Sequence, residues 1–156
     1  MQNLRSLPLV VDDPAAKADP HAWLAAQNDN IRKVSTVNER GALEQRPWIA
    51  PESYVDPTAQ LIGGMIVGKG VYVGPYAVVR LDEMPSAEPL VIGDESNIQD
   101  CAVVHSTSQQ IGSRVIVAHQ SIVHGAVIED DVTIYIQAVA DGGGTVIGRG
   151  AFLHQG

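Results

Sequence analysis

The chain has 156 residues, of which 45% are hydrophobic and only 4% aromatic, and its ten basic and eighteen acidic side chains give a formal net charge of -8. This length fits one domain with a substantial core, and the hydrophobic fraction excludes wholesale disorder. The acidic balance argues against a nucleic-acid partner, because neutralising phosphates requires clustered lysine and arginine.

The chain contains one cysteine, Cys101, which cannot form an internal disulfide, so nothing indicates stabilisation for an oxidising compartment. No stretch approaches the roughly eighteen apolar residues of a membrane-spanning helix. The N-terminal sequence becomes acidic too early for a signal peptide. These features predict a soluble, cytoplasmic protein with no membrane partner.

Residues 1–50 show no repeat and are predicted to form an N-terminal extension. Pro14 suits the first turn of a helix, with Asp12 or Asp13 as its cap, and alanine-rich sequence follows. Pro20 breaks or kinks this helix. We therefore expect an irregular, partly helical segment with a structural role.

Residues 51–156 contain an aliphatic residue about every six positions, commonly followed by glycine or a polar residue. The aliphatic positions are Val67, Val73, Val79, Ile92, Ile98, Val104, Ile111, Val117, Val123, Ile128, Ile134, Ala140, Ile147 and Leu153. A six-residue period fits neither an α-helix nor simple strand alternation, but is typical of a short strand followed by a corner. It predicts an all-β domain, a left-handed parallel β-helix of the hexapeptide-repeat type.

The alternative fold, a β-sandwich with frequent glycine turns, does not require so long a series of units in register. The scarcity of aromatic residues also favours the β-helix, because its narrow triangular interior has no room for rings. The chain ends at Gly156 in the middle of a unit. We therefore expect the β-helix to be truncated at its C-terminal end.

The repeat predicts which side chains stack on one another in successive coils. Arg80, His105 and His124 each follow the inward-facing residue of the third face, provided that residues 81–91 form a loop. They should therefore form one file with a spacing of about 4.8 Å. Two imidazoles at this separation can share a divalent metal, with each nitrogen about 2.0–2.1 Å from the ion.

A third ligand is needed, and His119 is the candidate. It lies two residues past Val117, on the adjacent face, so it points away from the file within its own subunit. In a closed threefold ring of identical prisms, the second face of one subunit can meet the third face of the next. His119 would then complete a three-histidine site. The alternative for each histidine is a hydrogen-bonded surface residue.

Further polar residues near the predicted site are Asp82, Glu83, Asn97, Gln99 and Asp100. An arginine with two aspartates can hold a subunit interface together or orient groups around a metal. Gln99 has both a donor and an acceptor, so it can orient a hydroxide or a small oxygen-rich substrate. Glu83 is a candidate proton carrier, with a solvated loop carboxylate as the alternative.

At these residues the sequence resembles the γ-class carbonic anhydrases, which are trimeric left-handed β-helices. The resemblance covers about residues 51–140. The matching motifs are Arg80-x-Asp82-Glu83, GDESNIQD (93–100), His105, AHQSIVHG (118–125) and Glu129-Asp130-Asp131.

The resemblance implies a homotrimer that interconverts CO₂ and bicarbonate at a metal shared between subunits. His105 and His124 would bind the metal from one subunit, and His119 from its neighbour. The resemblance further implies substrate contacts by Gln99, Asn97 and Arg80, proton transfer by Glu83, and a supporting ion-pair cluster of Arg80, Asp82 and Asp100. A three-histidine Zn²⁺ leaves one position for water and lowers its pKa to about 7. Fe²⁺ or Co²⁺ fits the same ligands.

The sequence departs from the family pattern at three places. Residues 106–110 lack the carboxylate that serves as a proton shuttle after the first metal histidine, and residues 133–135 and 141–144 also differ. Glu88, between Pro85 and Pro89, is a candidate replacement for the shuttle. Two other functions stay open: an acyltransferase or thioesterase-like enzyme acting on coenzyme A esters, and a catalytically silent, metal-bearing scaffold subunit.

Overall fold

The computed structural model describes Ala18 and residues 47–81, 89–105 and 110–155. The helix predicted near Pro14 and the candidate residues Asp82, Glu83 and Glu88 lie outside these ranges. In the described ranges, no helix has the length and apolar character needed to cross a bilayer.

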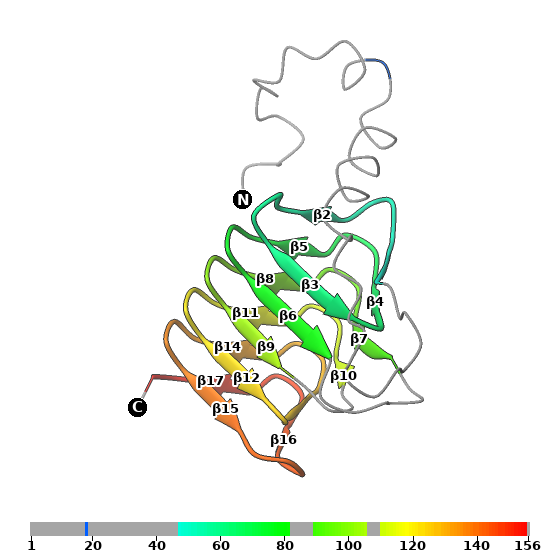
Figure 1. Cartoon of the computed structure of the whole chain (residues 1–156). Coiled ribbons are helices and arrows are strands. Elements are labelled where there is room, and N and C mark those ends of the chain that lie inside the picture. Colours follow the sequence, from blue (N-terminus) through cyan, green and yellow to red (C-terminus); the bar gives the residue numbers. More distant parts are fainter. Residues whose placement is uncertain (1–17, 19–46, 82–88, 106–109, 156) are drawn as a thin grey trace, which may run out of the picture.

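Short strands form three parallel sheets (Figure 1). Sheet A contains β1 (Trp48–Ile49), β4 (Met65–Val67), β7 (Leu90–Ile92), β10 (Gln110–Ile111), β13 (Val127–Ile128) and β16 (Val146–Ile147). Sheet B contains β2 (Tyr54–Val55), β5 (Tyr72–Val73), β8 (Asn97–Ile98), β11 (Ile116–Val117), β14 (Thr133–Ile134) and β17 (Phe152–Leu153). Sheet C contains β3 (Gln60–Gly63), β6 (Val78–Leu81), β9 (Val103–His105), β12 (Ile122–His124) and β15 (Val139–Asp141).

The chain visits sheets A, B and C in turn and then returns to sheet A one coil further along the axis. Figure 1 shows the strands of successive coils stacked along this axis, wound in the left-handed sense. The predicted left-handed parallel β-helix is therefore confirmed. Its sheets begin at Trp48, which already pairs with Ile66 of the second coil.

The predicted inward positions form the core. From Val67 to Ala140 each of them is at most 3% exposed. The aliphatic residue of one coil is the register partner of the aliphatic residue at the same position in the next coil. Ile147 and Leu153, in the last described coil, are only partly buried. A second row of small buried residues fills the corners: Val71, Ala77, Ala102, Val115, Val132 and Ala138. Small side chains at both rows explain the low aromatic content.

From Val67 onward, the described corners between sheets A and B and between sheets B and C turn through a residue with positive φ, three positions after an inward residue. These residues are Gly70, Tyr76, Glu95, Cys101, Arg114, Gln120, Asp131, Gln137 and Gly150. The left-handed conformation costs a non-glycine residue about 1–2 kcal/mol, so the stacked coils must hold it in place. The third corner, from sheet C to sheet A, instead carries connections of variable length. These connections leave from the carboxyl ends of the sheet C strands.

Buried serines link neighbouring coils at the corners between sheets A and B. The Ser96 hydroxyl donates to the Gly112 carbonyl at 2.9 Å and accepts from the Val115 amide at 3.1 Å. Ser53 makes the same pair of bonds to Gly68 and Val71. Each hydroxyl therefore satisfies one backbone donor and one backbone acceptor that the corner leaves without a strand partner.

Replacing Ser96 by alanine should lower the free energy of unfolding by about 1–3 kcal/mol, because a buried amide and a carbonyl both lose their partner. Urea unfolding followed by circular dichroism measures the effect. Ser113→Ala is the matched control, since Ser113 engages through its backbone amide and not through its hydroxyl. A Ser96→Ala variant as stable as the control would show that the Ser96 hydroxyl does not stabilise the corner.

Candidate metal centre

Four polar side chains stack at the carboxyl ends of the sheet C strands. Arg80 of β6 is the register partner of His105 in β9, His105 of His124 in β12, and His124 of Asp141 in β15. The predicted file of Arg80, His105 and His124 is therefore confirmed, and Asp141 extends it by one coil. We call these four residues the histidine column.

The two histidine rings of the column lie next to each other. Their centroids are 5.1 Å apart and their planes are inclined by 35°. The His105 residue is half-buried, and the His124 side chain is 53% exposed. Two imidazoles held this close on paired strands suit two ligands of one divalent ion, which binds neutral imidazole nitrogen.

Asp141 contacts the ring of His124. The Nδ1 atom of His124 lies 2.7 Å from Oδ1 of Asp141, a distance at which the ring N–H donates to the carboxylate. This hydrogen bond is the main reason that the pKa of Asp141 lies below its usual range. Asp141 was not predicted as a site residue. The signal was present, because the repeat pair Ala140-Asp141 occupies the same position as Val123-His124.

His119 lies elsewhere, at the corner between sheets B and C that follows β11. Its Nδ1 atom is 3.8 Å from Oδ2 of Asp100, which occupies the same corner one coil earlier. The His119 carbonyl accepts a hydrogen bond from the Gln137 amide of the next coil. Backbone contacts between coils therefore fix the corner, and about half of the His119 side chain is exposed.

Gln99 and Asn97 accompany His119 and not the histidine column. Asn97 faces outward on sheet B between its register partners Tyr72 and Ile116. Gln99 follows the last residue of β8, and its backbone amide donates to the Val117 carbonyl. The sequence analysis grouped these residues around His105 because they share its coil. The fold places them on the adjacent sheet, where they join Asp100 and His119 in a second group, the His119 corner.

One chain does not bring the histidine column and the His119 corner together. His124 comes five positions after His119, a span of up to about 16 Å when extended. Within the described residues of the chain, no group of three histidine, cysteine, aspartate or glutamate side chains is arranged to hold a metal ion. The donor set of one chain thus fits a metal through His105 and His124 but needs a further ligand.

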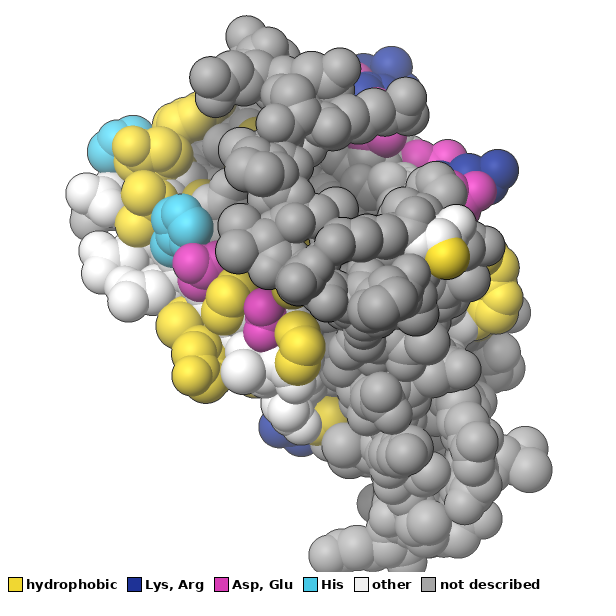
Figure 2. Space-filling view, turned by 90° about the horizontal axis from the view of Figure 1, so that it is seen from above, with side chains coloured by type: hydrophobic (Ala, Val, Ile, Leu, Met, Phe, Trp, Pro, Cys, Tyr) yellow, Lys and Arg dark blue, Asp and Glu magenta, His cyan; other side chains and the backbone are white. Residues whose placement is uncertain are grey.

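Exposed apolar side chains flank both groups. Val78, Val103, Ile122 and Val139 form an outward row on sheet C beside the column, with Ile122 at 38% and Val139 at 56% exposure. On sheet B, Tyr72, Ile116 and Tyr135 are similarly exposed. Figure 2 shows apolar, histidine and acidic side chains gathered along one side of the described surface. The exposed apolar side chains of this surface are typical of a surface that contacts another protein chain.

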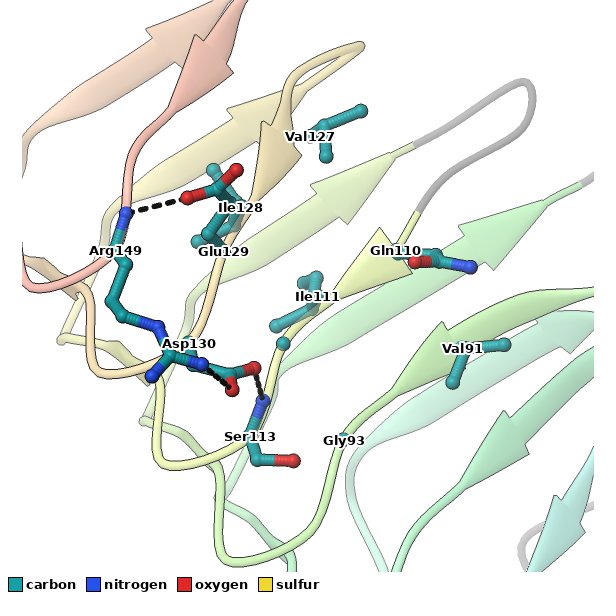
Figure 3. A pocket seen from close by; sticks show the side chains of 11 residues that line it. Val91, Gly93, Gln110, Ile111, Ser113, Val127, Ile128, Glu129, Asp130 and Arg149 are labelled. Atoms are coloured by element: carbon teal, nitrogen blue, oxygen red, sulfur yellow. Dashed lines mark hydrogen bonds and ion pairs between the residues drawn. The ribbon is translucent and has the colours of Figure 1, made fainter.

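A groove of about 570 Å³ lies on sheet A, away from these residues (Figure 3). Arg149 donates to Asp130 at 2.7 Å, and its amide donates to Glu129 at 2.8 Å. Asp130 also accepts from the Ser113 amide at 2.9 Å. The guanidinium of Arg149 is therefore paired with Asp130, and these bonds tie neighbouring coils together. Glu129 and Asp130, part of the resemblance, have a structural role here.

The fold and the column define the chain as a parallel left-handed β-helix carrying a pair of adjacent histidines. No family model matches the chain. It is 33% identical over 144 residues to a carbonic anhydrase of Methanosarcina thermophila, covering 70% of this chain and 57% of that protein. It is 36% identical over 96 residues to the carnitine operon protein CaiE of Escherichia coli O1:K1, covering 60% of this chain and 47% of CaiE.

Among solved structures, a hexapeptide transferase family protein from Anaplasma phagocytophilum superimposes with a TM-score of 0.53 at 23% identity, covering 74% of each chain. This likeness concerns the fold alone. The two sequence relatives show that the chain resembles the γ-carbonic-anhydrase-like hexapeptide-repeat proteins. The chain spans about half the length of the curated relatives it matches.

Proposed function

We propose that the protein catalyses the reversible hydration of CO₂ to bicarbonate at a metal held by three histidines between neighbouring subunits of a homotrimer. The observation that carries this proposal is the His105–His124 pair, two adjacent imidazoles in register. The similarity to a carbonic anhydrase over 70% of the chain supports the same reaction.

The ligands of the metal are His105 and His124 from one subunit and His119 from the next. A divalent metal, Zn²⁺ or alternatively Fe²⁺ or Co²⁺, supplies Lewis acidity that lets water act as a nucleophile at neutral pH. The column offers the paired imidazoles, and the exposed His119 offers the third from a different face. Three imidazoles leave an open position, as a catalytic site requires.

A closed ring of three chains would join each column to a neighbour's His119 corner. Every chain carries both groups, on different sheets, so three equivalent interfaces give three complete sites. The exposed apolar rows on sheets B and C provide surface to bury at such interfaces. Asp100 of the corner, together with Arg80 and Asp82, would supply a charged cluster at the same boundary.

The remaining residues have roles around the substrate. Gln99 and Asn97 lie on the face that carries His119, so they would enter the site from the neighbouring subunit. Their amide groups can donate to or accept from the oxygens of CO₂ and bicarbonate. Glu83, three residues beyond Arg80, would accept the proton released from water.

Alanine at any one of His105, His119 and His124 should reduce bound zinc to a small fraction of the wild-type content per subunit, because the two remaining imidazoles hold the ion too weakly. Elemental analysis of purified protein measures this, and CO₂ hydration should fall with the metal. His154→Ala is the control, since this histidine stacks on Tyr135 and not on the column.

Full zinc content in His119→Ala would contradict the site between subunits. A zinc-loaded wild type without CO₂ hydration would contradict the proposed reaction and leave the metal-bearing scaffold as the better reading. Turnover of coenzyme A esters without any bound metal would instead favour the acyltransferase or thioesterase alternative.

A mixing experiment tests the sharing of ligands directly. His105→Ala keeps an intact His119 corner, and His119→Ala keeps an intact column, so each mixed trimer contains one complete interface. Random reassembly of equal amounts should restore about a quarter of the wild-type zinc and activity, although each variant alone has almost none. No recovery after verified subunit exchange would place all ligands of any site within one chain.

Proton transfer can be tested at Glu83 and Glu88. A group that only passes protons to buffer limits turnover in dilute buffer, so Glu88→Gln should lower kcat there, leave kcat/KM nearly unchanged and be rescued by imidazole. Glu83→Gln should be harder to rescue, because Glu83 is expected closer to the metal. Equal kcat for wild type and Glu88→Gln in dilute buffer would remove Glu88 from the shuttle.

A further inference from the structure

We propose that Asp141 is a positioning residue for the metal centre, whose carboxylate accepts a hydrogen bond from Nδ1 of His124 and leaves Nε2 of that ring to bind the ion. The inference rests on the proposed metal-dependent function. It assigns a role to one of the stretches in which the sequence departs from the family pattern. The observation behind it is the 2.7 Å contact between the two side chains.

The backbone holds Asp141 firmly opposite His124. The two residues are register partners on β12 and β15, and the Gly142 amide donates to the His124 carbonyl at 2.9 Å. The carbonyl of Asp141 accepts from the Thr145 hydroxyl, and the Thr145 amide closes a turn onto Gly142. The carboxylate is therefore presented from a strand end anchored to the histidine it contacts, as a preorganised site requires.

Gly125 and Gly142 make this arrangement possible. Both have positive φ, of 76° and 112°, which an L side chain rarely adopts. A Cβ at Gly125 would lie 3.1 Å from the Gly143 amide nitrogen, so the two connections leaving β12 and β15 pass close together. The glycine-rich sequence after Asp141 thus lets the chain turn away directly behind the carboxylate without displacing it.

The chemical consequence concerns the tautomer of His124. A neutral imidazole carries one proton, and a carboxylate accepting at Nδ1 stabilises the form with the proton on that nitrogen. The lone pair is then on Nε2, ready for a metal before the ion arrives. Hydrogen-bond partners of this kind are typically worth a factor of 10–100 in metal affinity.

The first experiment needs no metal. In the metal-free wild type at about pH 8, above the ordinary histidine pKa of about 6.5, the ¹⁵N shifts of His124 should report protonated Nδ1 and bare Nε2. Asp141→Ala should shift the population toward the other tautomer, and Asp131→Ala should not. Asp131 is the matched control because it is an exposed aspartate in an ion pair, with Arg114, on a different corner. A wild-type His124 protonated at Nε2 would overturn the inference.

The second experiment measures zinc affinity by competition with a chelator. Asp141→Ala should weaken binding about 10–100-fold, with circular dichroism and sedimentation confirming fold and assembly. Asp141→Asn removes the same charge but keeps an oxygen that can accept a hydrogen bond from Nδ1. Its loss of zinc affinity should therefore be smaller. An unchanged Kd in Asp141→Ala, or equal losses in both variants, would overturn the positioning role.

These outcomes separate the inference from the proposed function. Zinc binding that depends on Asp141, in a protein that does not hydrate CO₂, would contradict the reaction and uphold the positioning role. The opposite outcome is an active, zinc-loaded protein in which Asp141→Ala changes neither the His124 tautomer nor the Kd for zinc. It would uphold the reaction and show that Asp141 has no role in the metal centre.

Discussion

The structure depends on the constant register with which each coil stacks on the one before. Parallel pairing holds each inward aliphatic residue directly over its counterpart, so Val79, Val104 and Val123 form one buried row. The residue after each of these is then forced into an outward row of its own, at the spacing of adjacent strands. The histidine column is a by-product of core packing, and a one-residue slip of β9 or β12 would bury an imidazole and expose a valine.

This register is also what a single sequence can predict well. A fixed period gives the face and the coil of each residue, which was enough to predict the fold, the core and the file of Arg80, His105 and His124. It does not give the direction of a side chain or its choice of partner. Gln99 shares a coil with His105 yet follows a strand of another sheet. The repeat gives Asp141 the same position as His124 one coil earlier, but it does not show that the carboxylate contacts the ring. The structural bonds of Asp130 were hidden for the same reason, because they join residues that are distant in sequence.

A triangular β-helix also limits what one chain can build on its surface. Its outward side chains lie on three faces that diverge, so a column supplies ligands from one direction only. An ion on such a surface would keep most of its coordination positions open to water. A three-histidine site therefore needs a second surface that approaches the first. The exposed His119 corner, flanked by apolar side chains on sheets B and C, has the composition expected of that second surface. In the proposed site, function and assembly would be coupled, since loss of the interface would remove a ligand.

In the proposed site, the column supplies both a ligand and the group that orients it. Each added coil places one more side chain at the same spacing, so the neighbour of a histidine is always a residue one coil away. A histidine on one side offers a second ligand, and an aspartate on the other offers an acceptor for the ring nitrogen that the ion does not use. The order Arg80, His105, His124, Asp141 places a cation and a carboxylate at opposite ends of the column, separated by two imidazoles that are neutral when they bind metal. Exchanging His105 with Arg80, or His124 with Asp141, would place a cation or a carboxylate between the two histidines. The sequence of the column, and not only its composition, therefore makes it suitable as half of a metal site.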